Sequence, residues 1–379
     1  MKLLLIFLSC SLLVQAQLYK DPSQPNEARV ADLLGRMSAS EKAWQLFMVP
    51  SDFDTTKCRF NDGIFGIQLF ASALSDPTQQ ILNYSSANTN LELIARANDI
   101  QKHFIENTRL GIPIIFFDEG LHGLVRAQAT SFPQAIALAA TFDPKLVSSA
   151  AAHIAREARL IGVRQILSPV LNLATDVRWG RTEETYGEDP FLSSKMGVAY
   201  MKTLEDENVI ATPKHFVANV GDGGRDSYPI DMNERYLSEI HYPPFKDAVQ
   251  KAGARSIMTS YNSVNGSPAT ANNYLLNDLL KKQWGFNGYV VSDCGAINDI
   301  FDSHKIVNTQ EEAAALGIRR GCDLNCGSVY QRALKKAVSQ GLIGVKEIDL
   351  SVYRLMLARM KLGMFDPSEL VPYAQIPFE

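Results

Sequence analysis

The sequence predicts an α/β protein with the fold of a (β/α)8 TIM barrel. Eight short apolar runs alternate with long helical stretches along most of the chain. The 379 residues are 46% hydrophobic, a size and composition that suit one large barrel. Eight strand–helix units in one chain of this length favour a closed parallel barrel with helices around it.

The eight expected strands are short and rich in β-branched or aromatic residues. They cover Gln45–Val49, Gly63–Phe70, Ile112–Phe117, Gln165–Leu173, Val209–Phe216, Ser256–Tyr261, Gly288–Ser292 and Cys322–Leu324. A doubly wound open sheet is the alternative, but it requires a G-x-G-x-x-G turn after the first strand, and none lies there. The glycine-rich stretch 221–224 follows the fifth strand and is interpreted as a loop.

The expected helices lie between these strands. They cover Leu91–Glu106, Pro133–Leu160, Phe191–Asn208, Glu234–Ala252, Tyr274–Trp284 and Glu311–Arg320. Ser38-Ala39-Ser40-Glu41 has the capping-box pattern that begins a further helix.

The N-terminal segment MKLLLIFLSCSLLVQAQ predicts a signal peptide over residues 1–16, because its apolar run is too short to span a bilayer. A buried first element and a lipid anchor at Cys10 are the alternatives. We therefore expect a secreted or periplasmic protein without a membrane span. The barrel is expected over residues 17–366, and the aperiodic segment 367–379 is interpreted as the start of an interdomain linker.

Four cysteines remain after the leader: Cys58, Cys294, Cys322 and Cys326. Cys294 and Cys326 follow neighbouring strands of the expected barrel, which predicts a disulfide in an oxidising compartment. Two buried free thiols are the alternative, and the pairing of Cys58 and Cys322 stays open. No second cysteine pair or His-x-x-x-His motif accompanies them, so we expect no metal site.

The charge balance argues against a nucleic-acid partner. The chain has 37 basic and 41 acidic residues, a net charge of −4, and no basic run. No motif indicates a cofactor.

Polar residues follow the expected strands where a barrel places its catalytic mouth. They form the segments Asp118-Glu119-Gly120-Leu121-His122, Asp176–Arg181, Lys214-His215, Tyr261-Asn262 and Ser292-Asp293-Cys294. A structural ion-pair network would also account for them. Carboxylates beside cations offer the donors and acceptors that sugar hydroxyls need, and an ionised carboxylate is the nucleophile of retaining glycoside hydrolysis.

Aromatic residues near the same strand ends are candidates for stacking on a sugar ring. They are Trp179, Tyr186, Phe216 and Tyr261. A different enzyme class would use Lys214 as a Schiff-base lysine.

Several segments together resemble family 3 of the glycoside hydrolases. They are GYVVSDCGAI, KHF at 214–216, DVRWGRTEETYGEDP at 176–190, MTSYNSVNG at 258–266, EKAWQL at 41–46 and the closing LARMKLGMFDP. The resemblance runs from about residue 25 to residue 367.

The resemblance implies that Asp293 is the catalytic nucleophile. It also implies that sugar hydroxyls contact Glu119, Arg181, Lys214, His215 and Arg225, and that Tyr261 hydrogen-bonds the nucleophile. Glu183, Glu184, Glu188 and Asp189 are expected to brace their loop through ion pairs and helix capping.

Two positions depart from the pattern of the family's glucosidases, which usually have Asp in place of Glu119 and often Trp in place of Cys294. Glu with Cys resembles the xylosidase branch. The resemblance therefore favours a β-D-xylosidase acting on an oligosaccharide or aryl glycoside, with α-L-arabinofuranosidase as a side activity. A β-glucosidase and a non-catalytic carbohydrate-binding barrel are the alternatives.

The chain offers no motif for the general acid. Single-domain relatives use a histidine in the loop after the KHF motif, but residues 217–231 contain none. Two-domain relatives carry the acid on a following α/β sandwich domain, which the resemblance implies for the full-length protein.

Overall fold

Eight short parallel strands form a closed barrel in the computed structural model of the chain. The structure describes residues 17–50, 60–69, 71–73, 82–84, 89–221 and 228–371. The barrel strands are β1 (Phe47–Pro50), β2 (Gly66–Gln68), β5 (Ile115–Asp118), β6 (Val163–Ile166), β7 (Ile210–Ala211), β9 (Ser256–Met258), β12 (Tyr289–Val291) and β13 (Asn325–Cys326). The sequence placed a strand at or next to each of these positions.

Hydrogen bonds connect the strands into a ring. Six of them form a parallel sheet in the order β13-β1-β2-β5-β6-β7, and β9 pairs with β12. The chain after β7 reaches β9 through the Phe216–Thr259 bridge, and β12 reaches β13 through the Val291–Leu324 bridge. The eighth strand begins at Asn325, one residue beyond the expected run, although Leu324 already pairs with β12.

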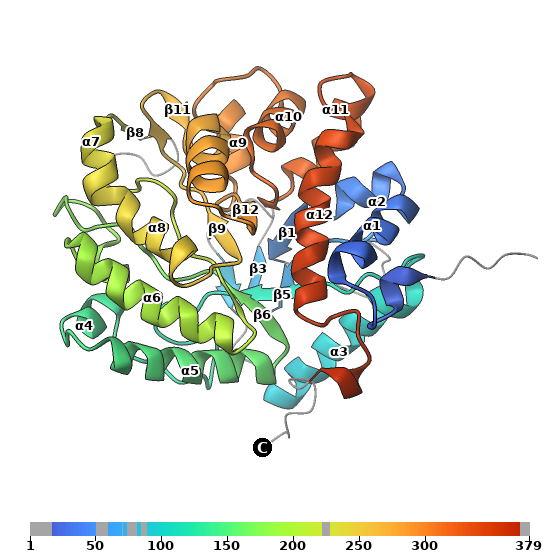
Figure 1. Ribbon diagram of the computed structural model, residues 1–379, viewed down its shortest axis with the longest axis horizontal. Coiled ribbons are helices and arrows are strands. Elements are labelled where there is room, and N and C mark those ends of the chain that lie inside the picture. Colours follow the sequence, from blue (N-terminus) through green and yellow to red (C-terminus); the bar gives the residue numbers. More distant parts are fainter. Residues whose placement is uncertain are drawn as a thin grey trace, which may run out of the picture.

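Helices surround the barrel strands, as Figure 1 shows. The α-helices are α1 (Asn26–Arg36), α2 (Ala39–Trp44), α3 (Asn90–Asn107), α4 (Ala135–Ala139), α5 (Pro144–Leu160), α6 (Pro190–Asp206), α7 (Glu234–Tyr236), α8 (Tyr242–Gln250), α9 (Ala296–Phe301), α10 (Gln310–Arg320), α11 (Val329–Ser339) and α12 (Val345–Lys361). The wider π-helices are η4 (Leu237–His241) and η6 (Tyr274–Gln283), and 3-10 turns form η1 (Leu18–Lys20), η3 (Thr182–Glu184), η5 (Ala269–Ala271) and η7 (Ser368–Leu370). Helices α5, α6 and α8 lie in a row on one side of the barrel, and α12 packs beside α1 and α2 on another.

Among the described residues, five further short strands lie in loops between the barrel strands. Strands β3 (Ala71–Ala73) and β4 (Leu82–Tyr84) form an antiparallel hairpin after β2. Strands β8 (Pro229–Ile230), β10 (Ser263–Val264) and β11 (Ser267–Pro268) form a small sheet over the ends of β7 and β9.

The helix expected over Tyr274–Trp284 forms the π-helix η6, and two other expected helices also differ from the structure. The single helix expected over Pro133–Leu160 is broken into α4 and α5. Phe142 adopts a left-handed backbone (φ 53°) at the break, and the Asp143 carboxylate accepts from the backbone N–H of Lys145 to cap α5. The helix expected over Glu234–Ala252 widens into η4 just before Pro243 and Pro244, which lack the N–H donors that a regular helix needs.

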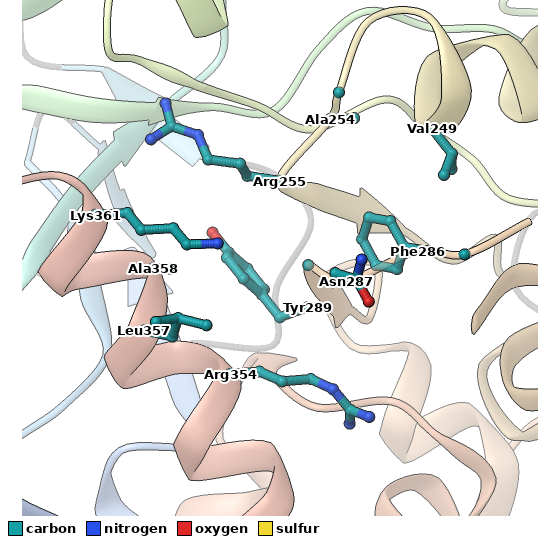
Figure 2. A pocket seen from close by; sticks show the side chains of 13 residues that line it. Val249, Ala254, Arg255, Phe286, Asn287, Tyr289, Arg354, Leu357, Ala358 and Lys361 are labelled. Atoms are coloured by element: carbon teal, nitrogen blue, oxygen red, sulfur yellow. The ribbon is translucent and has the colours of Figure 1, made fainter. Parts of the chain in front are cut away.

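The floor of the barrel contains a cavity of about 210 Å³ at the N-terminal ends of β9 and β12. Arg255 and Tyr289 line it from the strands, and Arg354 and Lys361 line it from α12 (Figure 2). The cavity lies at the N-terminal end of the barrel strands, whereas active sites in this fold lie at their C-terminal ends. It is therefore separate from the polar residues at the C-terminal strand ends.

Candidate active site

The predicted site residues follow the C-terminal ends of five different strands. Glu119 follows β5, Arg181 lies in the loop after β6, Lys214 and His215 follow β7, Tyr261 follows β9 and Asp293 follows β12. Arg225 lies outside the described residues. Because the strands are parallel and closed into a ring, these side chains gather at one rim of the barrel.

Asp293 is almost fully buried at this rim, with 5% of its surface exposed. Its Oδ1 accepts the backbone N–H of Cys294 at 2.8 Å. Its Oδ2 has no hydrogen-bond partner among the described residues and lies 3.5 Å from His215 Nε2. One carboxylate oxygen is thus held in place while the other retains its lone pairs for a reaction or a ligand.

Lys214 and Glu119 form a close ion pair across the rim. The ammonium of Lys214 donates to both carboxylate oxygens of Glu119, at 2.9 and 2.8 Å. The lysine side chain is 4% exposed and the glutamate 28%. The pair therefore presents its carboxylate side to solvent, where a sugar hydroxyl can reach it.

Arg181 brings a second cation to the rim. Its guanidinium donates from Nε and Nη2 to both oxygens of Glu184, each at 2.8 Å. Burial opposes the charged form, but Glu184, Asp293 and Glu119 together raise the pKa of Arg181 above its usual value. Nη1 of Arg181 is buried without a partner among the described residues, so one donor remains for a ligand.

Of the four acidic residues expected to brace this loop, Glu184 and Asp189 make such contacts. Glu184 holds Arg181, and the Asp189 carboxylate accepts from the backbone N–H of Leu192 to cap α6.

Tyr261 and a disulfide fix the loop that carries Asp293. The Tyr261 hydroxyl donates to the carbonyl of Cys294, the residue after Asp293, at 2.9 Å. Cys294 and Cys326 form a disulfide with an S–S distance of 1.98 Å. Cys322 is a buried free thiol, and Cys58 lies outside the described residues.

The aromatic residues proposed for stacking are mostly core residues, which corrects that interpretation. Phe216 is fully buried against the rings of Phe245 and Trp284, at 5.3 and 5.7 Å. Tyr186 is also fully enclosed, with 2% of its surface exposed. Their side chains fill the space between strands and helices rather than the mouth of the barrel.

Two buried polar residues lie next to the site: Asn172, which sequence reasoning missed, and Asp118, which it noted at a strand end without assigning a role. Asn172 accepts the backbone N–H of His215. A polar residue inside the expected apolar strand Gln165–Leu173 was the sequence signal that could have identified it. Asp118 lies at the end of β5, where its Oδ1 accepts from Gln68 Nε2 at 2.9 Å and from the backbone N–H of Glu119 at 2.8 Å. Burial raises the pKa of Asp118 to about 7, although both hydrogen bonds oppose the shift.

The described residues contain neither a metal-binding cluster nor a membrane-spanning helix. No group of three or more His, Cys, Asp or Glu side chains is placed to hold a metal ion in that part of the chain. None of the helices in it is both long and apolar enough to cross a membrane.

The chain is similar to proteins that act on glycosides. The profile of the glycosyl hydrolase family 3 N-terminal domain matches residues 41–358. A protein named beta-xylosidase from Formosa agariphila is 36% identical over 86% of this chain and 47% of its own length. A beta-xylosidase/alpha-L-arabinofuranosidase 2 from Medicago sativa is 36% identical over 78% of this chain and 44% of its own.

The chain also superimposes on solved structures of glycosidases. A β-glucosidase from Erythrobacter marinus superimposes with a TM-score of 0.82 and 32% identity over 94% of this chain and 47% of its own. A family 3 exo-beta-xylosidase in complex with a xylobiose aziridine probe superimposes with a TM-score of 0.74 and 26% identity over 94% of this chain and 43% of its own. The chain thus spans about half the length of the relatives that it matches.

Asp118→Asn should change how stability depends on pH. The folded pKa of Asp118 lies above its unfolded value, so the native state holds an extra proton between about pH 4 and 7 and loses stability as the pH rises through this range. The asparagine keeps the accepting Oδ1 but cannot ionise. Relative to the parent chain, the variant should gain roughly 2–4 kcal/mol of unfolding free energy between about pH 4 and 8, measured by urea denaturation. A difference that stays constant with pH would contradict this assignment.

Proposed function

The chain belongs to glycosyl hydrolase family 3, and from this membership we propose that it forms the nucleophile-bearing barrel of an exo-acting retaining β-glycoside hydrolase. The observation that carries the proposal is Asp293, buried at the barrel rim near Arg181 with Oδ2 unpaired among the described residues. A carboxylate held in this way suits attack on an anomeric carbon.

The proposed reaction has two steps. Oδ2 of Asp293 bonds to the anomeric carbon while the glycosidic C–O bond breaks and the leaving oxygen takes a proton from a general acid. Water then attacks the anomeric carbon and gives a proton to the deprotonated general acid, while the bond to Oδ2 breaks, which releases the sugar and restores the carboxylate. Lys214, His215, Arg181 and the Glu119 carboxylate supply donors and acceptors for the hydroxyls of the terminal sugar.

Two other functions are less well supported. A Schiff-base lysine requires a neutral amine that is free to attack, whereas Lys214 donates to both oxygens of Glu119. A non-catalytic carbohydrate-binding barrel would bind the same sugars without using Oδ2 of Asp293. Turnover of a dinitrophenyl glycoside by the parent chain, lost in Asp293→Asn, distinguishes an enzyme from such a barrel.

Asp293→Asn should abolish glycoside cleavage and leave the fold intact, because an amide is a poor nucleophile of nearly the same shape. We expect the turnover of dinitrophenyl β-xyloside to fall by roughly 10³-fold or more, with an unchanged melting temperature. Activity within tenfold of the parent would show that another group attacks the substrate.

We infer that the general acid is supplied from outside the barrel. Both oxygens of Glu119 and of Glu184 accept hydrogen bonds from a cation, so neither carboxyl has a proton free to donate. The relatives that the chain matches are about twice as long. This length leaves room for the α/β sandwich domain that the sequence implied, with residues 367–379 leading toward it.

The barrel alone should depend strongly on the leaving group. Dinitrophenolate leaves without protonation, whereas xylobiose and alkyl xylosides require the acid, whose contribution is typically 10²–10⁴-fold. We expect this chain to cleave dinitrophenyl β-xyloside measurably and xylobiose slower than a two-domain relative by a factor in that range. If it cleaves xylobiose as fast as such a relative does, the acid lies within these 379 residues.

We propose xylose as the terminal sugar, with glucose as the alternative. Glu119 is one methylene longer than aspartate, which brings its carboxylate toward the space that the CH2OH group of a hexose would occupy. Relatives named beta-xylosidase, and one named beta-xylosidase/alpha-L-arabinofuranosidase, support a pentose. Plant-type oligosaccharides are therefore the substrate class that fits best.

Glu119→Asp should move the preference toward glucose. The expected change in the ratio of kcat/KM for aryl β-glucoside over aryl β-xyloside is about tenfold, within the roughly 1–3 kcal/mol that such a pocket contact provides. Glu347→Asp is the matched control, because Glu347, which lies on α12, also pairs with a cation, Arg319. An unchanged ratio for Glu119→Asp would remove Glu119 from sugar selection.

We also propose that residues 1–16 are a signal peptide and that the protein is secreted or periplasmic. The Cys294–Cys326 disulfide supports this location, since such bonds persist in oxidising compartments.

A further inference from the structure

The side-chain amide of Asn172 binds both the backbone and the ring of His215. Asn172 is 1% exposed and lies in the segment after β6 that pairs with the chain at Lys214. Its Nδ2 donates to the His215 carbonyl at 2.9 Å. Its Oδ1 accepts the His215 backbone N–H at 2.8 Å and lies 2.9 Å from ring Nδ1 of the same histidine.

These contacts determine the orientation of the amide. Only the NH2 group can donate to the His215 carbonyl, and only the oxygen can accept the backbone N–H. The two backbone hydrogen bonds therefore fix Oδ1 toward the ring, without reference to the ring itself.

The orientation of the amide in turn determines where the histidine carries its proton. An amide oxygen accepts but does not donate, so a hydrogen bond at 2.9 Å requires a proton on Nδ1. In a neutral imidazole the second nitrogen, Nε2, then has only a lone pair. Nε2 is the atom that lies 3.5 Å from Oδ2 of Asp293.

The opposite tautomer would place an N–H at Nε2, directed at the oxygen that is proposed to attack the sugar. A hydrogen bond there would occupy a lone pair of Oδ2 and lower its reactivity. With the proton on Nδ1 of a neutral ring, the lone pair of Nε2 is instead able to accept a hydrogen bond from a hydroxyl donor.

We propose that Asn172 is a positioning residue that holds neutral His215 in the Nδ1–H tautomer and thereby keeps Oδ2 of Asp293 free. The proposal extends the proposed function, since it assigns Asn172 a role at the same nucleophile. Its deciding measurement needs no substrate, so that its failure and the failure of the glycosidase proposal can be told apart.

The test is ¹⁵N NMR of the full chain labelled at histidine, with the His215 signals identified by their loss in His215→Gln. At pH 7.5 the parent chain should show His215 protonated at Nδ1 and unprotonated at Nε2. A proton on Nε2, in either the neutral or the doubly protonated ring, would overturn the proposal. This result is obtained on the parent chain and does not require any Asn172 variant to fold.

Two variants separate positioning from general packing. Asn172→Ala should populate both tautomers of His215 and lower kcat for dinitrophenyl β-xyloside by at least about tenfold, as expected when an imidazole loses the partner that fixes its tautomer. Gln165→Ala removes another fully buried amide, which donates to Thr212 Oγ1, and should leave the His215 signals unchanged. Equal tautomer changes in both variants, or none in Asn172→Ala, would contradict the assigned role.

Discussion

Closure of the parallel sheet is the constraint on which the remaining structure depends. The ring closes where β13 pairs with β1, through the Phe47–Asn325 and Met48–Cys326 partners, and where Leu324 pairs with Val291 of β12. An open sheet would leave the last strands apart from the first. Closure brings His215, which follows β7, within 3.5 Å of Asp293, which follows β12 in a different sheet.

The rim contains charged side chains whose burial without a partner would cost hydration free energy. Lys214 and Arg181 each have a carboxylate partner, which offsets the loss of hydration. Asp293 differs, since its Oδ2 lacks a hydrogen bond among the described residues although Arg181 and His215 lie near it. A purely structural ion-pair network would be expected to use both oxygens, so the unpaired one is the feature that points to chemistry.

The sequence predicted the order of strands and helices and the strand ends that form the site, because apolar runs and polar residues at their C-terminal ends are local patterns. It did not predict the break at Phe142 or the widened turn before Pro243, which depend on capping and on missing donors at single positions. Phe216 was assigned to the mouth because sequence proximity to Lys214 does not reveal to which side of a strand end a side chain points. Asn172 escaped notice because its role arises only when two strands meet.

The central claim is that Asp293 attacks the sugar, and covalent trapping tests it most directly. A 2-deoxy-2-fluoro-xyloside with a dinitrophenyl leaving group needs little acid assistance, so it should react with the barrel itself. Peptide mass spectrometry after inactivation should then find the fluorosugar on the peptide that contains Ser292-Asp293-Cys294, attached to Asp293. Attachment to any other carboxylate would contradict the account.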